Sequence, residues 1–274
     1  MSAIPSLSVV IPAYNEAVRL SHSLELVLSF VNHYAPSELI VVDDGSTDET
    51  ATVATRVFQT SEHVQTRIIR YHQNRGKGHA LRTGLLAARA PFALFTDADL
   101  STPITEIPRI ADPVLRGQAD VTFGSRALDR SLTFIRQPWL RETGGRVFNL
   151  MTRAATGLPF WDTQCGFKAF RMDVFRPILR AATIDRFAFD VEWLYIAQRA
   201  GLRLHEIPVR WDHCEGSKVS MHRDSIRMLQ EIRLIRRQAD AGAYDVAIAE
   251  IRATPRPSAP DWTLQQLDRR AAIA

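Results

Sequence analysis

The fold class follows from the stretch Glu38-Leu-Ile-Val-Val-Asp-Asp-Gly-Ser46. Its four consecutive apolar residues, Leu39 to Val42, are typical of a β-strand that is buried on both faces, as in a parallel sheet. The aspartates and glycine after them indicate a turn, and the stretch from Thr47 to Thr60 is predicted to be a helix. A buried strand, a polar turn and a helix in this order form one repeat of an α/β protein.

The same order recurs on both sides of this stretch. Further strands are predicted at Leu7–Ile11, Thr66–Tyr71, Pro91–Thr96 and Asp120–Gly124, and further helices at Glu16–Asn32 and Gly76–Arg89. Polar clusters follow four of the strands, at Pro12–Glu16, Asp43–Ser46, Asp97–Asp99 and Gly124–Arg126. Because ligands of such sheets bind beyond the carboxyl ends of the strands, we expect these clusters to converge on one edge of a mostly parallel sheet in a single α/β domain.

The second half of the chain is less regular. Strands are predicted at Gly166–Arg171 and Arg203–Val209, and helices at Thr143–Thr156, Phe189–Ala200 and Arg223–Gln238. The last of these helices is basic, with apolar residues at three-residue spacing at Ile226, Leu229, Ile232 and Ile235. This apolar stripe can pack on the protein core or lie on an anionic membrane surface, and the sequence leaves both open. From Ala239 to Ala274 the chain turns to Ala, Pro and Arg, which predicts a loosely held tail.

Composition limits the class of protein. The 274 residues are 46% hydrophobic and 23% charged, which is typical of a globular chain. No apolar run approaches the roughly 20 residues that span a bilayer, and Met1 to Ser8 lacks the features of a signal peptide. We therefore expect a cytoplasmic protein in which Cys165 and Cys214 are reduced. The net charge of +4 favours an anionic partner, which could be nucleic acid, an acidic membrane surface or a phosphate-bearing substrate.

The polar clusters suggest the kind of ligand. Asp97-Ala-Asp99 follows the apolar strand, and two carboxylates there can hold a hard divalent cation whose shell is completed by a pyrophosphate; the alternative is a solvated turn. A carboxylate of the pair Asp43-Asp44 can accept from a base N–H or a ribose hydroxyl, and Ser46 or Thr47 can also cap the helix that follows. Asn74-Arg-Gly-Lys-Gly78 is a glycine-flanked basic turn whose backbone N–H groups can approach phosphate. This turn lacks the spacing of a P-loop, which argues against an ATPase.

Lysine is rare in this chain. Only three of the 34 basic residues are lysines, at Lys77, Lys168 and Lys218. A chain that uses arginine almost everywhere is expected to keep lysine where a compact ammonium fits and a planar guanidinium does not. The three lysines are therefore expected at positions that require a compact ammonium, although chance survival at surface positions is the alternative.

Seven motifs, in order along the chain, resemble a known enzyme family. Four of them are similar to family-2 glycosyltransferases of the GT-A fold: Val10–Glu16, Val41–Asp48, Asn74–Gly78 and Thr96–Asp99. Three more resemble the dolichyl-phosphate or polyprenyl-phosphate β-glucosyltransferase branch: Asp162–Lys168, Phe187–Glu192 and Glu215–Lys218. Related mannose synthases carry an arginine where this chain has Asp212, which argues against a mannose synthase.

The resemblance implies roles for individual residues. Asp99 would bind the metal ion, Mg²⁺ or Mn²⁺. Arg126 would face the pyrophosphate or the acceptor phosphate, and Lys168 and Lys218 would contact the acceptor. The expected nucleotide-sugar contacts are Pro12, Tyr14, Glu16, Val42, Asp44, Lys77, Asp97, Ala98 and Asp99. The expected catalytic residues are Asp97, Asp99, Arg126, Lys168, Asp190 and Lys218.

The implied reaction is an inverting transfer of a hexose, with UDP-glucose as the expected donor and a polyprenyl or dolichyl phosphate as acceptor. Residues 1–238 would form the catalytic domain, with 1–128 binding the nucleotide sugar and 129–238 the acceptor. Nucleic acid is not expected as a partner, whereas peripheral contact with the cytoplasmic membrane face is. A phosphate nucleophile is mostly ionised near neutral pH, with a second pKa of about 6, so it needs no strong base.

Other functions remain open at this point. The donor could be GDP-mannose, or the acceptor a sugar hydroxyl, in which case Asp190 or Glu192 is the expected base. The alternative interpretation of these two residues is a helix N-cap and a solvated first-turn acid. A non-catalytic nucleotide-sugar-binding protein would keep fewer of the charged motif residues. A nucleotidyltransferase of the same fold would carry a glycine-rich loop after Ile11, which this chain lacks.

Overall fold

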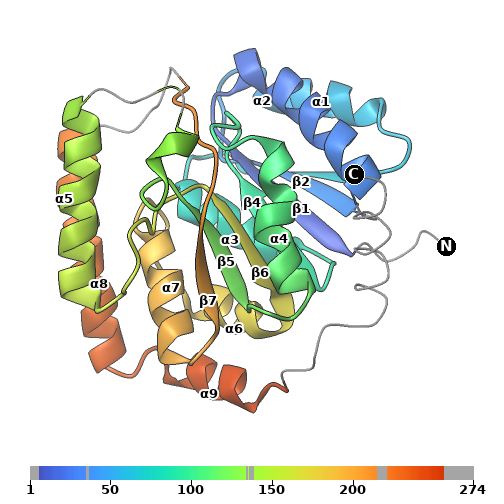
Figure 1. Cartoon of the computed structure of the whole chain (residues 1–274). Helices are drawn as coiled ribbons and strands as arrows, with labels where there is room; N and C mark the ends of the chain where they lie inside the picture. Colours follow the sequence, from blue (N-terminus) through green and yellow to red (C-terminus); the bar gives the residue numbers. More distant parts are fainter. Residues whose placement is uncertain (1–5, 35–36, 134, 136–138, 215–220, 256–274) are drawn as a thin grey trace.

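The computed structural model describes residues 6–34, 37–133, 135, 139–214 and 221–255 (Figure 1). These residues form one seven-stranded sheet with the strand order β3-β2-β1-β4-β6-β5-β7. The strands are β1 (Leu7–Ala13), β2 (Ser37–Asp43), β3 (Gln65–Arg70), β4 (Phe92–Thr96), β5 (Val121–Ser125), β6 (Phe167–Arg171) and β7 (Leu204–Pro208).

Strand direction confirms the mostly parallel sheet. Strand β6 alone runs antiparallel to its neighbours β4 and β5, and the other strand pairs are parallel. Strand β1 pairs with β2 on one side and with β4 on the other, so the order of the strands reverses there. The loops that follow β1 and β4 therefore diverge and open a crevice, which is where α/β sheets of this kind bind ligands.

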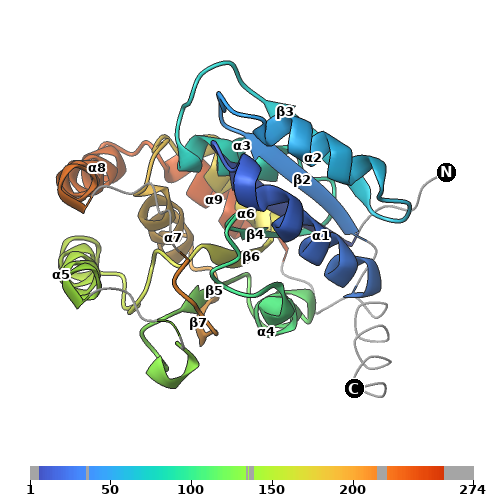
Figure 2. The same cartoon turned by 90° about the horizontal axis from the view of Figure 1, so that it is seen from above.

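Helices cover both faces of the sheet (Figure 2). One face carries α1 (Ala17–Tyr34), α2 (Thr50–Gln59) and α4 (Ile107–Leu115), and the other carries α3 (Lys77–Ala87), α6 (Met172–Ala181), α7 (Phe189–Arg199) and α9 (Asp245–Ala253). Two short 3₁₀ turns lie at Ile104–Glu106 and Arg130–Leu132. Successive side chains of a strand point to opposite faces of the sheet, so Val9 packs toward α1 and Val10 toward α3. The remaining helices, α5 (Trp139–Thr156) and α8 (Met221–Asp240), lie side by side outside α7 in both views.

Helices α4 and α6, like α9 below, were not predicted from the sequence. Helix α4 contains Pro113 and helix α6 contains Pro177, and a proline inside a helix removes a backbone donor and lowers helix propensity. Tertiary packing outweighs that cost, because each helix buries an apolar face, with Ile110 in α4 and Ile178 in α6 fully buried.

The apolar stripe of α8 packs on the protein. Ile232 and Ile235 are buried in the core cluster that includes α6 and α7, and Leu229 packs against its edge. The side chain of Ile226 lies outside the described residues. Of the two interpretations left open by the sequence, core packing is therefore confirmed for the described part of the stripe, and the membrane-facing stripe is wrong.

The prediction of a loosely held tail from Ala239 onward is wrong for the residues up to 255. Helix α9 packs against α6, and its Ile251 is fully buried. The Tyr244 hydroxyl, just before this helix, donates to Glu192 Oε1 at 2.9 Å. The alanine-rich composition hid an apolar face formed by Tyr244, Ile248 and Ile251 at helical spacing. Residues 256–274 of the predicted tail lie outside the described residues.

The packing of α9 can be measured. Ile251→Ala should lower the free energy of unfolding by about 2–4 kcal/mol, because a buried isoleucine is truncated and leaves a cavity. The matched control is Val246→Ala in the same helix, where the side chain is 82% exposed and little change is expected. The measurement is urea unfolding of both variants. Equal stabilities would show that the helix does not pack as described.

Candidate functional site

The loops after β1 and β2 are joined by polar contacts. The backbone N–H of Asn15 donates to Ser46 Oγ at 2.9 Å, and the N–H of Thr47 donates back to Asn15 Oδ1 at 2.8 Å. The Glu16 N–H donates to Thr50 Oγ1 at 2.8 Å at the start of α2. Asn15 adopts a φ of +53°, which asparagine tolerates better than most residues. These contacts fix one wall of the crevice.

The carboxylate of Asp44 holds the turn that precedes α3. Asp44 is 3% exposed and accepts from the backbone N–H groups of Arg75 and Gly76, each at 2.8 Å, and from Asn74 Nδ2 at 2.9 Å. Burial raises the pKa of Asp44, and the two backbone donors oppose that rise. Asp44 therefore positions the basic turn. Its predicted contact with the nucleoside stays a prediction.

The basic turn and the Asp97-Ala-Asp99 loop meet through one ion pair. Lys77 is the first residue of α3, and its Nζ lies 2.6 Å from Asp97 Oδ1. Burial lowers the pKa of Lys77, but the carboxylates of Asp97 and Asp190 outweigh it and raise the pKa above its ordinary value. The loop itself is a tight turn, in which Leu100 N–H donates to Asp97 O at 3.2 Å and Ser101 N–H to Asp99 Oδ1 at 2.9 Å.

Gly166 makes room for the Asp97 side chain. A Cβ atom added at Gly166 would overlap the Asp97 carboxylate, so any other residue at this position would require the Asp97 side chain to shift. Gly166 belongs to the second half of the chain and directly precedes β6. The Asp97 carboxylate is thus held between the start of α3 and the start of β6.

Lys168 is buried rather than available to a substrate. It is 1% exposed, and its Nζ donates to Cys165 O at 2.6 Å and to Thr163 O at 3.0 Å and lies 3.0 Å from Asp190 Oδ1. An ammonium has three hydrogens, and these three partners account for them. The prediction that Lys168 contacts the acceptor phosphate is therefore wrong: it neutralises Asp190 inside the protein.

Asp190 is the buried partner of that lysine. It is 4% exposed, and burial raises its pKa to about 6 against the opposing effect of Lys168 and Lys77. Helix α7 begins at Phe189 after Ala188, so Asp190 is not the N-cap of the helix that the alternative interpretation required.

The two interpretations of Glu192, as a base for the acceptor and as a solvated acid, are both wrong. It is fully buried, and its oxygens accept from Thr183 N, Thr183 Oγ1, Ile184 N and the Tyr244 hydroxyl, at 2.9 to 3.1 Å. A carboxylate with this many internal donors ties α7 to the loop before it and to the start of α9.

Arg126 is held by a carboxylate and lies over an aromatic ring. Its Nε donates to Asp162 Oδ2 at 2.6 Å and its Nη2 to Asp162 Oδ1 at 2.8 Å, and its guanidinium carbon lies 5.6 Å from the centre of the Trp211 ring. Glu206 on β7 accepts from the backbone N–H groups of Asp162 and Trp161, at 2.7 and 2.9 Å. Asp162, Trp211 and Glu206 were not predicted as site residues, although Asp162 is the first residue of one of the motifs.

The remaining predicted residues are spread over the same edge. Tyr14 is half-exposed, Glu16 pairs with Arg19, and Ala98 is buried. Pro12 and Val42 lie side by side near the ends of β1 and β2. Lys218 lies outside the described residues.

The acidic loop fits a divalent cation in part. Asp97 and Asp99 supply hard oxygen ligands, and the Asp97 Oδ1 atom is buried with the Lys77 ammonium 2.6 Å away. Within the described ranges no cluster of three or more His, Cys, Asp or Glu side chains could hold a metal. A cation here would therefore take much of its shell from ligand oxygens.

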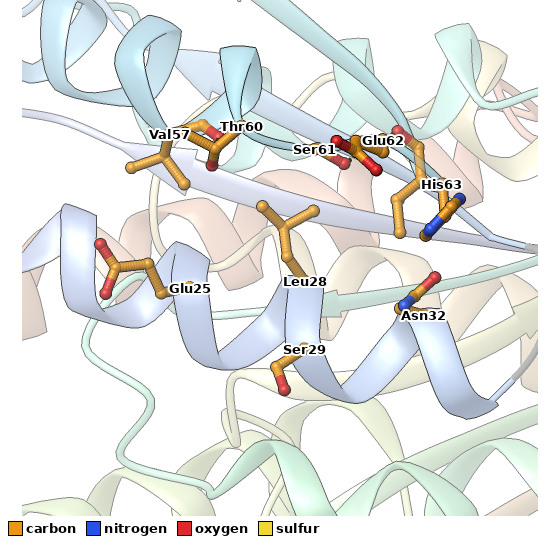
Figure 3. Close-up of a pocket in the computed structure, with 10 residues that line it drawn as sticks. Glu25, Leu28, Ser29, Asn32, Val57, Thr60, Ser61, Glu62 and His63 are labelled. Atoms are coloured by element: carbon orange, nitrogen blue, oxygen red, sulfur yellow. Dashed lines mark hydrogen bonds between the residues drawn. The ribbon is translucent and has the colours of Figure 1, made fainter.

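A separate hollow lies far from this edge, beside the start of β2 and β3 (Figure 3). It has a volume of about 300 Å³ and lies between α1 residues, such as Glu25 and Asn32, and the segment Thr60–Val64. It contains none of the predicted site residues.

The chain was compared with known proteins. The sequence profile of glycosyl transferase family 2 matches residues 8–179. The dolichyl-phosphate β-glucosyltransferase of Dictyostelium discoideum is 34% identical over 241 residues, covering 84% of this chain and 73% of that protein. The enzyme of the same name from Saccharomyces cerevisiae is 33% identical over 254 residues, covering 87% of this chain and 76% of that protein.

Solved structures support the fold. Glucosyl-3-phosphoglycerate synthase from Mycobacterium tuberculosis, in complex with UDP, matches with a TM-score of 0.62 at 21% identity, over 84% of this chain and 80% of that chain. The same enzyme with Mn²⁺, UDP and glucosyl-3-phosphoglycerate matches with a TM-score of 0.56 at 20% identity, over 92% and 81%. The GT-A fold is thus confirmed.

The buried pair of Lys168 and Asp190 yields a test. Lys168→Met should lower the free energy of unfolding by about 3–5 kcal/mol near neutral pH, because it leaves a buried carboxylate without its cation. Adding Asp190→Leu should recover most of that loss, since the unpaired charge is then gone. Urea unfolding of the single and double variants is the measurement. A single variant as stable as the parent would mean that the lysine is not buried as described.

Proposed function

The chain belongs to glycosyl transferase family 2, and we propose on this premise that the enzyme transfers glucose from UDP-glucose to a polyprenyl or dolichyl phosphate. An acceptor phosphate oxygen attacks C1 of the sugar, the bond from C1 to the diphosphate oxygen breaks, and UDP leaves. The new bond forms on the opposite face, so the α-linked donor gives a β-linked product. The support for the acceptor class begins with the relatives, whose names state this reaction.

The observation that best supports a phosphate as the acceptor is that both candidate bases are buried and held by internal contacts. Asp190 is paired with Lys168, and Glu192 is fully buried among internal donors. A sugar hydroxyl would need a base to remove its proton, whereas a phosphate monoester, with a second pKa of about 6, is already an anion near neutral pH. Both carboxylates are buried and held by internal partners, so neither is placed to reach an acceptor, and the proposed acceptor does not require a base.

The protein then has to hold two anions in line and offset charge on the leaving diphosphate. A divalent cation held by Asp99, with Asp97 beside it, would supply that charge when bound. Arg126 is fixed by its carboxylate partner and by Trp211, so its guanidinium would be oriented in advance toward a phosphate. Lys77 would contribute its ammonium at the start of α3. The same proposal includes the division of the domain, in which residues 1–128 bind the donor and residues 129–238 bind the acceptor.

Asp99→Ala should lower turnover by at least about 100-fold, because it removes the charge that anchors the cation opposite the leaving group. The measurement is product formation from UDP-glucose and polyprenyl phosphate with Mg²⁺ or Mn²⁺, with mass spectrometry of the lipid product and GDP-mannose as a comparison donor. Glu62→Ala, in the distant hollow, is the control and should keep full activity. Full activity in EDTA would rule out the metal, and a preference for GDP-mannose would rule out the proposed donor.

A lipid acceptor requires contact with a membrane, and we propose that one face of α5 provides it. Val147, Leu150 and Met151 lie on adjacent turns and are 50%, 66% and 38% exposed. Near the end of the helix, Arg153 lies 4.2 Å over the ring of Trp161, which is 57% exposed. Apolar residues with a tryptophan and an arginine suit a bilayer interface. No helix in the described ranges is both long and apolar enough to cross a membrane.

The α5 face can be tested with vesicles. Val147→Glu combined with Leu150→Glu should weaken binding to vesicles of phosphatidylcholine and phosphatidylglycerol by roughly tenfold or more, since two apolar contacts become charges of the same sign as the lipid. Because both side chains are exposed, the thermal midpoint should stay unchanged. Val246→Glu on α9 is the matched control. Co-sedimentation that is the same for all three proteins would remove α5 as the contact.

A further inference from the structure

The ion pair between Lys77 and Asp97 occupies the position where the proposed function expects a cation and a diphosphate. Its two atoms are 2.6 Å apart, and the side chains are 26% and 32% exposed, so a ligand can reach the pair from the crevice. In the part of the chain that the structure describes, no other carboxylate lies within ion-pair distance of Lys77. The acidic loop is therefore already neutralised in part by the protein itself.

We propose that Lys77 is an exchangeable counter-ion: it keeps Asp97 from binding a bare divalent cation, and it moves from Asp97 to the diphosphate when donor and cation bind together. This inference rests on the proposed function, because it requires an anionic nucleotide as the second partner of Lys77. It makes the lysine a positioning residue that couples the binding of the two ligands.

The two members of the pair differ in freedom to move. The carboxylate of Asp97 lies against Gly166, and the Asp97 backbone is held in the turn, where its carbonyl accepts from Leu100 N–H. Lys77 ends in a compact ammonium on a flexible four-carbon stem, which can change partners without any movement of the backbone. The exchange therefore requires motion of the lysine alone.

Charge balance favours joint binding. Three carboxylates, those of Asp97, Asp99 and Asp190, face two ammonium groups, those of Lys77 and Lys168. A divalent cation that bound Asp97 without a nucleotide would lie beside the Lys77 ammonium, and the repulsion between these two positive charges opposes its binding. A diphosphate added with the cation supplies the negative charge that Lys77 needs once it leaves Asp97. Each ligand should thus raise the affinity for the other by the same factor.

The geometry around Lys77 provides a matched control. Arg75 lies two residues earlier in the same turn, is 55% exposed, and its Nη2 lies 4.0 Å from Asp185 Oδ2, away from the acidic loop. Removing either cation changes the net charge by the same amount, but only Lys77→Gln frees the Asp97 carboxylate. A difference between the variants is therefore due to the ion pair and not to net charge.

The experiment is calorimetric titration of the full chain with Mn²⁺ alone, UDP alone and Mn²⁺ in the presence of UDP. For the parent protein we expect weak Mn²⁺ binding that UDP strengthens at least tenfold. Lys77→Gln should bind Mn²⁺ alone about tenfold more tightly than the parent and bind UDP with Mn²⁺ about tenfold more weakly. Arg75→Gln should leave Mn²⁺ binding within about twofold of the parent.

The outcomes separate the two proposals. If the parent does not bind UDP with Mn²⁺ at all, the proposed function fails. If the parent binds UDP but Lys77→Gln does not strengthen Mn²⁺ binding, the counter-ion proposal is wrong while the function stands. Should Lys77→Gln fail to fold, the parent still decides, because equal Mn²⁺ affinity with and without UDP would overturn the proposal.

Discussion

The hydrogen bonds from the Arg75 and Gly76 backbone to the buried Asp44 carboxylate are the interaction on which the site depends. Asp44 follows directly after β2, and through these bonds a strand of the sheet fixes the point at which α3 begins. Lys77 is the first residue of that helix, so the sheet, through Asp44, fixes where Lys77 lies relative to the acidic loop. A buried carboxylate that accepts two backbone N–H groups is strongly held, because either donor left without it would be unsatisfied.

Three cation–carboxylate pairs lie around the crevice, and their burial separates their roles. Lys168 with Asp190 is closed inside the protein, so it can only stabilise and orient. Arg126 with Asp162 is joined by two parallel hydrogen bonds and supported by Glu206, which gives a rigid guanidinium at the rim. Lys77 with Asp97 is partly exposed and joined at one atom pair. The three pairs thus become more exposed from Lys168 with Asp190, in the core, to the two pairs that line the opening.

The sequence predicted the parallel sheet and its polar edge because buried strands and the turns after them are local patterns. The partners of the motif residues could not be predicted in the same way. Lys168 lies in β6 opposite Phe95 and Phe123, on a strand buried on both faces, so alternation carried no sign that its ammonium points inward. The rarity of lysine correctly marked Lys168 as a special position, but rarity does not distinguish a substrate contact from an internal ion pair. Helix α9 was missed for a different reason, since its alanine-rich composition hid an apolar face that packs against α6, an element far away in the sequence.

The antiparallel strand β6 has a consequence for how the enzyme is assembled. Because β6 runs against its neighbours, the segment Thr163–Gly166 enters the sheet at the edge where β4 and β5 end, and it brings Gly166 against the Asp97 carboxylate. The Asp97 side chain therefore fits its place only because the residue some 70 positions later in the sequence is a glycine. Long-range contacts of this kind raise the contact order of a fold, which slows folding. A break in the chain before Gly166 would therefore separate the acidic loop from the glycine that leaves room for the Asp97 carboxylate.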